Sequence, residues 1–90
     1  MRRIEKKTWP EYFEAVLDGK KRYDLRLNDF QIEEGDVLVL REWNPTAKAY
    51  TGRVCERAVT YVGRFTQSDL EKWWSRNAIE NRGIQIISLQ

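Results

Sequence analysis

The sequence contains no histidine and a single cysteine, Cys55. A zinc site needs about four Cys, His or carboxylate ligands, so a Cys/His metal centre is excluded. Catalytic Ser-His-Asp and Cys-His arrangements are excluded as well, because both need an imidazole. One cysteine cannot form an intramolecular disulfide, which is typical of a reducing compartment. We therefore interpret Cys55 as a small core residue rather than a reactive thiolate.

Long apolar runs are also missing, and nothing approaches the 18 or so residues that a membrane-spanning helix requires. The basic start at residues 1–7 is not followed by the apolar stretch of a signal peptide. Prolines (2) and glycines (5) are few, and no repeat, linker or low-complexity tract interrupts the 90 residues. These features predict one soluble, cytoplasmic domain spanning 1–90, with no membrane contact, no metal and no cofactor.

The charge is modest and unevenly distributed. The net charge is +2, with charged residues making up 33% of the chain. Residues 1–27 hold eight Lys and Arg against five Asp and Glu, whereas residues 28–42 hold one basic residue against five acidic ones. A nucleic-acid partner would therefore meet a small basic surface near the N-terminal third.

The clearest helix signal follows residue 8. Thr8 and Glu11 have the spacing of a capping box, and Pro10 lies in the first turn, where its missing N–H is harmless. Gly19 is suited to the left-handed cap at the end. The apolar positions recur at helical intervals and form one stripe: Trp9, Tyr12, Phe13, Val16 and Leu17. The stripe predicts that this helix, Trp9 included, packs on the core.

Five segments have the pattern of strands. Val37–Leu40 is an uninterrupted aliphatic run, which predicts a central strand covered on both faces, with Trp43 in the core. The polar stretch from Asn44-Pro45 to Gly52 predicts a hairpin loop. The expected strands are 3–7, 21–27, 37–43, 53–62 and 84–89.

A second, shorter helix is expected near the C-terminus. Ser68 and Glu71 repeat the capping-box spacing, and Leu70, Trp73 and Trp74 give it an apolar face. The element order becomes β-α-β-β-β-α-β. This order predicts an α+β fold, a small mixed sheet or barrel with two short helices beside it, and argues against a doubly wound fold. Adjacent tryptophans point about 100° apart on a helix, so one is expected to be exposed, for base stacking or for a dimer contact.

One polar segment stands out after the first helix. Gly19 lets the chain turn sharply, so Lys21 can project past the helix end, while Asp24 and Arg26 lie two apart on one face of an extended chain. A lysine and an arginine can hold a phosphate or a base carbonyl, and a carboxylate can accept from an exocyclic amine. The alternative interpretation is a solvated surface ion pair worth under about 1 kcal/mol.

The spacing Gly19-x-Lys21-x-x-Asp24-x-Arg26 resembles the G-x-K-x-x-E-x-R signature of the ASCH superfamily of PUA-like β-barrels, with Asp in place of the usual Glu. The chain also resembles DUF3850, a bacterial and phage branch of uncharacterised proteins. The blocks that carry this second resemblance, spread over residues 4–62, are Tyr12–Leu17, Asn28-Asp29, Gly35–Trp43, Thr51–Arg53 and Val59–Val62. Residues 64–83 look like a family-variable insertion.

The resemblance implies a PUA-like barrel with a cleft beside the first helix, binding RNA or a nucleotide-like ligand. The residues expected to contact that ligand are Gly19, Lys21, Asp24, Arg26, Trp73 and Trp74. Whether the protein is an enzyme stays open, as does its oligomeric state. A small protein-interaction module is another alternative, which predicts an exposed apolar patch around the two tryptophans.

The enzyme alternative is an amidohydrolase acting on acetylated cytidine, or a ribonuclease. A more distant bacterial member of the superfamily uses a lysine, a threonine two residues before the motif arginine, and a later glutamate. Lys21 matches the lysine, and Asp24 occupies the threonine position. The glutamates available for the third role are Glu56, Glu71 and Glu80.

Overall fold

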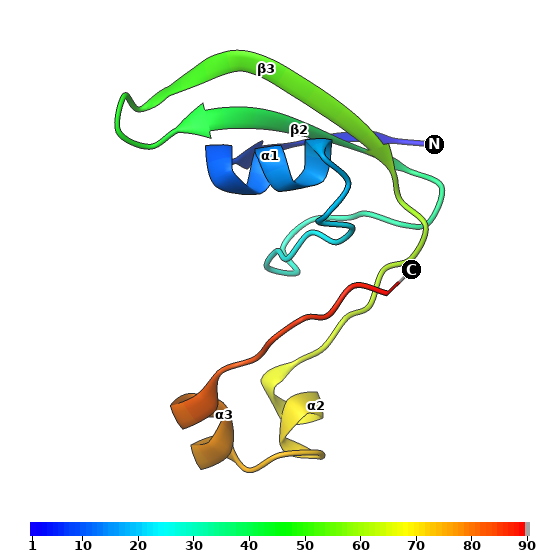
Figure 1. Ribbon diagram of the computed structural model, residues 1–90. Coiled ribbons are helices and arrows are strands. Elements are labelled where there is room, and N and C mark those ends of the chain that lie inside the picture. The colour runs from blue at the N-terminus through cyan, green and yellow to red at the C-terminus, as the bar shows by residue number, and fades with distance from the viewer. Residues whose placement is uncertain (90) are drawn as a thin grey trace.

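The computed structural model describes residues 1–89 and contains one three-stranded sheet with three short helices (Figure 1). The elements are β1 (Arg3–Thr8), α1 (Pro10–Leu17), β2 (Val37–Asn44), β3 (Ala49–Ala58), α2 (Gln67–Glu71) and α3 (Arg76–Arg82). Strand β2 lies in the middle, parallel to β1 and antiparallel to β3. The predicted α+β class, mixed sheet and central position of Val37–Leu40 are confirmed.

The core lies between α1 and the sheet. Phe13 and Val16 of α1 pack against Leu40 of β2 and Cys55 of β3, with Leu38 partly buried beside them. Leu40 and Cys55 are partners in the β2–β3 register, so both point to the α1 face. The predicted core role of Cys55 is confirmed. No helix within residues 1–89 is long and apolar enough to cross a membrane.

The sheet does not close into a barrel, which corrects the expected architecture. Residues 21–27 and 84–89 form no strand, and their apolar side chains are largely exposed, Leu25 by 70% and Leu27 by 80%. Alternation of apolar and polar residues makes a segment able to form a strand, yet pairing also needs a free edge alongside it. Within the described residues neither segment lies against such an edge.

The start of α1 also differs from the prediction. Thr8 is the last residue of β1 and is buried, while Trp9 occupies the N-cap position with no side-chain cap. The expected capping box is therefore wrong. The predicted stripe is only partly buried: Phe13 and Val16 face the sheet, whereas Trp9 (50%), Tyr12 (50%) and Leu17 (43%) remain exposed because they flank that single line of contact. Gly19 does take the predicted left-handed conformation after the helix, with φ of 82°.

The β2–β3 hairpin turns earlier than expected. Residues 45–48 form the turn, and β3 starts at Ala49, so the stretch before Gly52 belongs to the strand. The register shifts between Arg41 and Trp43, where Arg41 faces Val54 but Trp43 faces Tyr50. The surplus residues of β3 include Gly52, whose φ of 94° marks the bulge.

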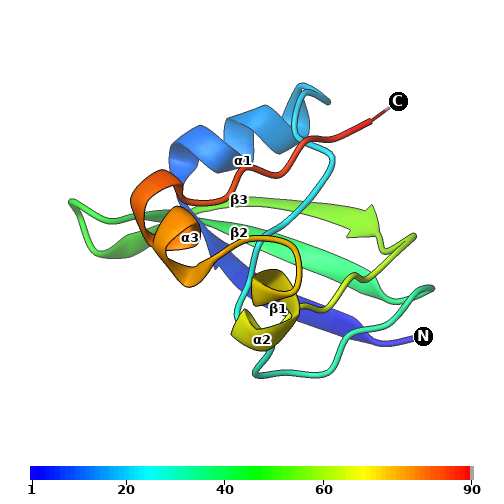
Figure 2. The same cartoon turned by 90° about the horizontal axis from the view of Figure 1, so that it is seen from below.

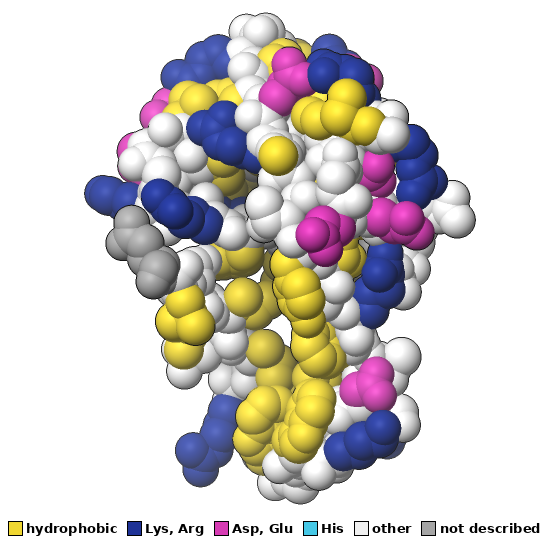
Figure 3. All heavy atoms as spheres, turned by 90° about the vertical axis from the view of Figure 1, so that its right-hand side faces the viewer, with side chains coloured by type: hydrophobic (Ala, Val, Ile, Leu, Met, Phe, Trp, Pro, Cys, Tyr) yellow, Lys and Arg dark blue, Asp and Glu magenta, His cyan; other side chains and the backbone are white. Residues whose placement is uncertain are grey.

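The C-terminal part contains two short helices where one was predicted. Thr66 and Asp69 form the capping box of α2, two residues before the expected pair, and Ser75 caps α3 separately. Figure 2, which views the molecule from below, shows α2 and α3 on the same side of the sheet as α1. The space-filling view shows hydrophobic side chains gathered on this part and a hollow between it and the sheet (Figure 3).

Candidate functional site

The turn after α1 positions the motif predicted from the sequence. The N–H of Lys20 donates to Asp18 Oδ1 at 3.0 Å, and the N–H of Lys21 donates to the carbonyl of Ala15 at 2.9 Å. The positive φ of Gly19 lets the chain fold back in this way. The backbone of Lys21 is thereby fixed against the last turn of the helix.

Lys21, Asp24 and Arg26 converge as the sequence predicts. Lys21 Nζ donates to the carbonyl of Tyr23 at 2.8 Å and lies 3.5 Å from Asp24 Oδ1, while Arg26 Nε donates to Asp24 Oδ2 at 2.6 Å. The Asp24 carboxylate is therefore held between two cations. Their side chains keep 13% (Lys21), 16% (Asp24) and 28% (Arg26) of their surface exposed, so this is a partly desolvated cluster and not a free surface pair.

The cluster continues into the sheet through Thr8 and Glu42, which the sequence pattern does not mark as site residues. Arg26 Nη2 donates to Thr8 Oγ1 at 3.1 Å, and Thr8 is the register partner of Glu42. Both Thr8 and Glu42 are buried. The sequence could have indicated Glu42, because it follows Leu38 and Leu40 at intervals of two and therefore faces the same side of the strand.

Glu42 is held by groups of strand β3. Thr51 donates to Glu42 Oε1 at 2.7 Å, and Arg53 Nε lies 3.3 Å from the same oxygen. Arg53 also donates to Glu14 of α1, which raises the pKa of its guanidinium above the ordinary value. The bulge around Gly52 aims Thr51 and Arg53 at one carboxylate, so polar groups line this end of the sheet from α1 to β3.

The three glutamates named from the resemblance lie elsewhere. Glu56 points to the opposite face of the sheet and pairs with Arg3, which lowers the pKa of the carboxyl. Glu71 pairs with Arg76 at 3.0 Å beyond the sheet, and Glu80 is exposed on α3. The structure does not bring any of them to Lys21. Within residues 1–89, no group of His, Cys, Asp and Glu side chains is arranged to hold a metal ion.

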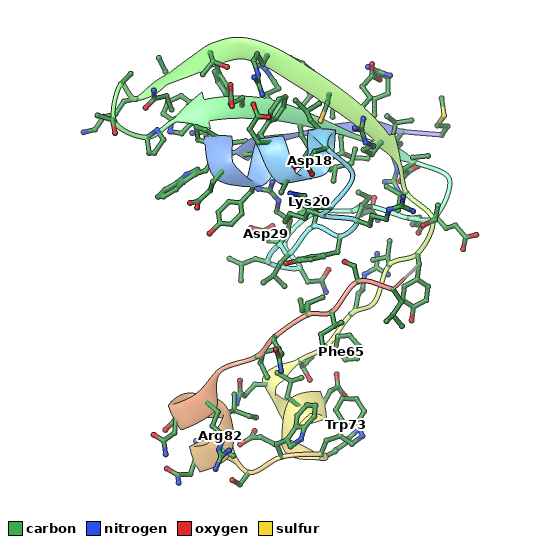
Figure 4. All side chains as sticks on the ribbon, in the orientation of Figure 1. Asp18, Lys20, Asp29, Phe65, Trp73 and Arg82 are labelled. Atoms are coloured by element: carbon green, nitrogen blue, oxygen red, sulfur yellow. The ribbon has the colours of Figure 1, made fainter. Side chains whose placement is uncertain are left out.

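A cavity of about 210 Å³ opens beside the motif. It is lined by Gly19, Lys20 and Arg22 from the turn, and by Ser88 and Leu89 from the C-terminal segment. Figure 4 shows Lys20 below the end of α1, in line with this placement. The cavity is therefore lined by Lys20 and Arg22, the basic neighbours of Lys21, and not by the side chain of Lys21 itself.

Trp73 and Trp74 lie apart from the motif. Figure 4 shows Trp73 with Phe65 and Arg82 in the helical part and Lys20 next to α1. The two tryptophans are 58% and 54% exposed, with ring centroids 5.9 Å apart in an edge-to-face arrangement, and Phe65 lies 6.1 Å from Trp73. The sequence predicted exposure for one tryptophan, and both are exposed. A second cavity of about 260 Å³ lies beside Trp74 and Arg82.

Comparisons with known proteins show which family this chain resembles. Residues 5–75, which include the motif and α2, match the family described as "Domain of unknown function (DUF3850)". The chain is 41% identical over 69 residues to an "Uncharacterized 12.9 kDa protein in GpA 3'region" of Escherichia phage P2. That alignment covers 77% of this chain and 57% of the phage protein. No solved structure matches the chain. With the family match extending over most of its length, the chain belongs to the DUF3850 family.

Proposed function

We propose that this protein binds RNA or a nucleotide-like ligand at the turn after α1. Lys21 and Arg26 supply the positive charge, and Asp24 orients both of them. The observation that carries the proposal is their convergence on one carboxylate at 3.5 and 2.6 Å, next to a cavity lined by Lys20 and Arg22. An ordered, partly desolvated guanidinium and ammonium bind phosphate more strongly than freely moving side chains do.

The charge of the turn supports an anionic ligand. Residues 18–26 contain four cationic side chains but only two carboxylates, Asp18 and Asp24. Asp18 is engaged by the backbone of Lys20, and Asp24 by Lys21 and Arg26. Lys20 is exposed at the cavity, and Arg22 donates to the carbonyl of Gly19 at 3.4 Å, so these cations add to the attraction for a phosphate.

The resemblance of Gly19-x-Lys21-x-x-Asp24-x-Arg26 to the ASCH signature supports the same proposal, because that PUA-like superfamily is proposed to bind RNA and related ligands. In this proposal the motif turn is the ligand-binding element of an ASCH-type protein. Trp73 and Trp74 take part only when the ligand is a strand long enough to reach the helical part, where each stacked base contributes about 1–3 kcal/mol.

The experiment measures binding of CMP, UMP and an eight-nucleotide oligouridine to the intact chain by titration calorimetry. Lys21→Ala and Arg26→Ala are each expected to weaken binding about tenfold, the loss of one charged hydrogen bond. Lys72→Ala is the matched control, since Lys72 also pairs with an aspartate three residues away, Asp69 at 3.4 Å. Equal losses in the control and in Lys21→Ala would contradict a specific site at the turn.

The same protein preparation tests the enzyme alternative. A carboxylate at position 24 is a poor substitute for a hydroxyl nucleophile in amide cleavage, so little or no hydrolysis of acetylated cytidine is expected. Robust turnover by the unmodified protein, abolished in Lys21→Ala, would replace the binding proposal with the amidohydrolase. Asp24→Thr is the variant expected to raise a weak activity.

A further inference from the structure

The outer face of the sheet, opposite α1, is the other surface that carries unusual chemistry. In Figure 1 all three helices of residues 1–89 lie below the sheet, so within this part of the chain no helix covers its upper face. Alternation along the strands turns one set of residues outward. This set comprises Arg3, Glu5, Lys7, Val37, Val39, Arg41, Trp43, Tyr50, Val54, Glu56 and Ala58.

The two halves of this outer face differ in charge. Toward the start of β1, Arg3 forms an ion pair with Glu56, and both pKa values shift so as to favour the charged forms. Toward the hairpin turn, Lys7 and Arg41 form no ion pair with any carboxylate among residues 1–89. The positive charges of the outer face are therefore paired with a carboxylate at the Arg3 end, whereas Lys7 and Arg41 at the other end have none within ion-pair distance among residues 1–89.

Aromatic rings hold these two cations in place. Lys7 Nζ lies 3.8 Å from the centroid of the Trp43 ring, and the guanidinium of Arg41 lies 4.0 Å from that of Tyr50. The two rings pack edge to face with centroids 5.0 Å apart. A cation–π contact orders a side chain without neutralising its charge, unlike a carboxylate partner. Trp43, predicted to lie in the core, is instead a half-buried support on this face.

The strand register brings the two cations side by side. Lys7 and Arg41 are register partners in the β1–β2 pair, so their side chains project from adjacent positions on one face. Lys7 Nζ and the guanidinium of Arg41 lie 5.9 and 4.0 Å from the centroid of the same Tyr50 ring, so the two like charges are close enough to repel each other. An anion placed between them would remove this repulsion.

We propose that Lys7, Arg41, Trp43 and Tyr50 form a binding surface for the phosphodiester backbone of a single-stranded nucleic acid. The cations contact the phosphates, and Tyr50, which is 42% exposed, contacts an unpaired base. A duplex hides its base faces from such a ring, which favours the single strand. This surface lies on the face opposite the turn after α1, so it goes beyond the proposed function and does not depend on it.

The test measures fluorescence anisotropy of a fluorescein-labelled 12-nucleotide oligouridine titrated with the intact protein at several salt concentrations. Lys7→Gln and Arg41→Gln are each expected to lower affinity about fivefold at 0.1 M salt and to reduce the log–log salt slope by about 0.7, the loss of one phosphate contact. The two variants are expected to lose the same affinity for an oligothymidine of the same length, because the contacts are to phosphate.

Arg3→Gln is the matched control, since Arg3 lies on the same strand and face but is already paired with Glu56. Arg3→Gln is expected to change affinity less than twofold. Lys7→Arg, which retains the charge, is also expected to change affinity less than twofold. An equal loss in Arg3→Gln, or unchanged slopes in the Lys7 and Arg41 variants, would overturn the proposal.

Two further measurements distinguish binding at this surface from misfolding of the variants and from binding at the turn after α1. Lysine acylation of the unmodified protein, read by mass spectrometry, is expected to be slowed at Lys7 by the oligouridine but not at the exposed Lys72. If Lys7 is not protected, the proposal fails whether or not Lys7→Gln folds. Repeating Lys7→Gln in the Lys21→Ala background is expected to give the same change of slope, even if the turn after α1 binds no nucleotide.

Discussion

Arg26 donates from Nη2 to the hydroxyl of Thr8 at 3.1 Å, and this hydrogen bond ties the turn after α1 to the last residue of β1. The same guanidinium donates from Nε to Asp24 Oδ2 at 2.6 Å. One planar side chain therefore spans the motif and the sheet, a geometry that the point charge of a lysine cannot reproduce.

Arg26→Lys tests this bridging role. The variant retains the positive charge but not the two divergent donors, so we expect ligand affinity to fall several-fold toward that of Arg26→Ala. The free energy of unfolding should drop by no more than about 1 kcal/mol, because the pair is partly exposed. Calorimetric titration and urea unfolding provide the two values. Full affinity in Arg26→Lys would show that charge alone suffices.

Leu40→Ala tests the core between α1 and the sheet. Leu40 is among the most deeply buried side chains, so its truncation is expected to cost about 2–5 kcal/mol in urea unfolding. Leu38→Ala should cost less, since Leu38 is only partly buried. Leu27→Ala is the exposed control, with a change within about 0.5 kcal/mol. A loss at Leu40 no larger than the one at Leu27 would contradict the central position of β2.

Asp36 predicts a dependence of stability on pH. Its carboxylate accepts from the N–H groups of Arg2 and Glu33, both at 2.9 Å, and these bonds lower its pKa below the ordinary value of 3.8. A lowered pKa in the folded state means that the stabilisation is present above about pH 4 and disappears as the pH falls through the folded pKa.

Thermal melting of Asp36→Asn measures this contribution. At pH 7 the variant should melt below the unmodified protein, and the difference should shrink steadily below pH 4. Asp29→Asn, in an exposed loop, is expected to melt like the unmodified protein throughout this range. A constant difference between pH 7 and pH 2 would assign the effect of Asp36→Asn to something other than its charge.

The exposure of Trp73 and Trp74 predicts that replacing either residue affects binding more than it affects stability. Both are more than half exposed, so alanine at either position should cost far less than the roughly 3–5 kcal/mol of a buried tryptophan. If they stack on bases, single-stranded RNA should quench their fluorescence, and the alanine variants should bind it more weakly. Fluorescence that ignores RNA but changes with protein concentration would identify a self-association surface instead.

Local signals in the sequence determined several elements of this protein. The apolar spacing of Phe13 and Val16 with Gly19 behind them was sufficient to place α1, because helix periodicity and a left-handed cap are properties of adjacent residues. The aliphatic run of Val37–Leu40 predicted the central strand for the same reason. The convergence of Lys21, Asp24 and Arg26 also followed from short spacing along one turn.

Only the tertiary structure decided which strands pair and which side chains they bury. Residues 21–27 and 84–89 have strand patterns but find no edge, and pairing depends on chain segments far away in sequence. The sequence indicates a helix cap at Thr8, whereas in the structure Thr8 is buried and accepts a hydrogen bond from Arg26. The sequence indicates only the end of a strand at Glu42, whereas the bulge of β3 places Arg53 beside its carboxylate. Trp43 fits a core pattern, yet the register with Lys7 and Tyr50 places it on the outer face. Periodicity reports that a residue faces one side, whereas the packing of distant segments decides what that side meets.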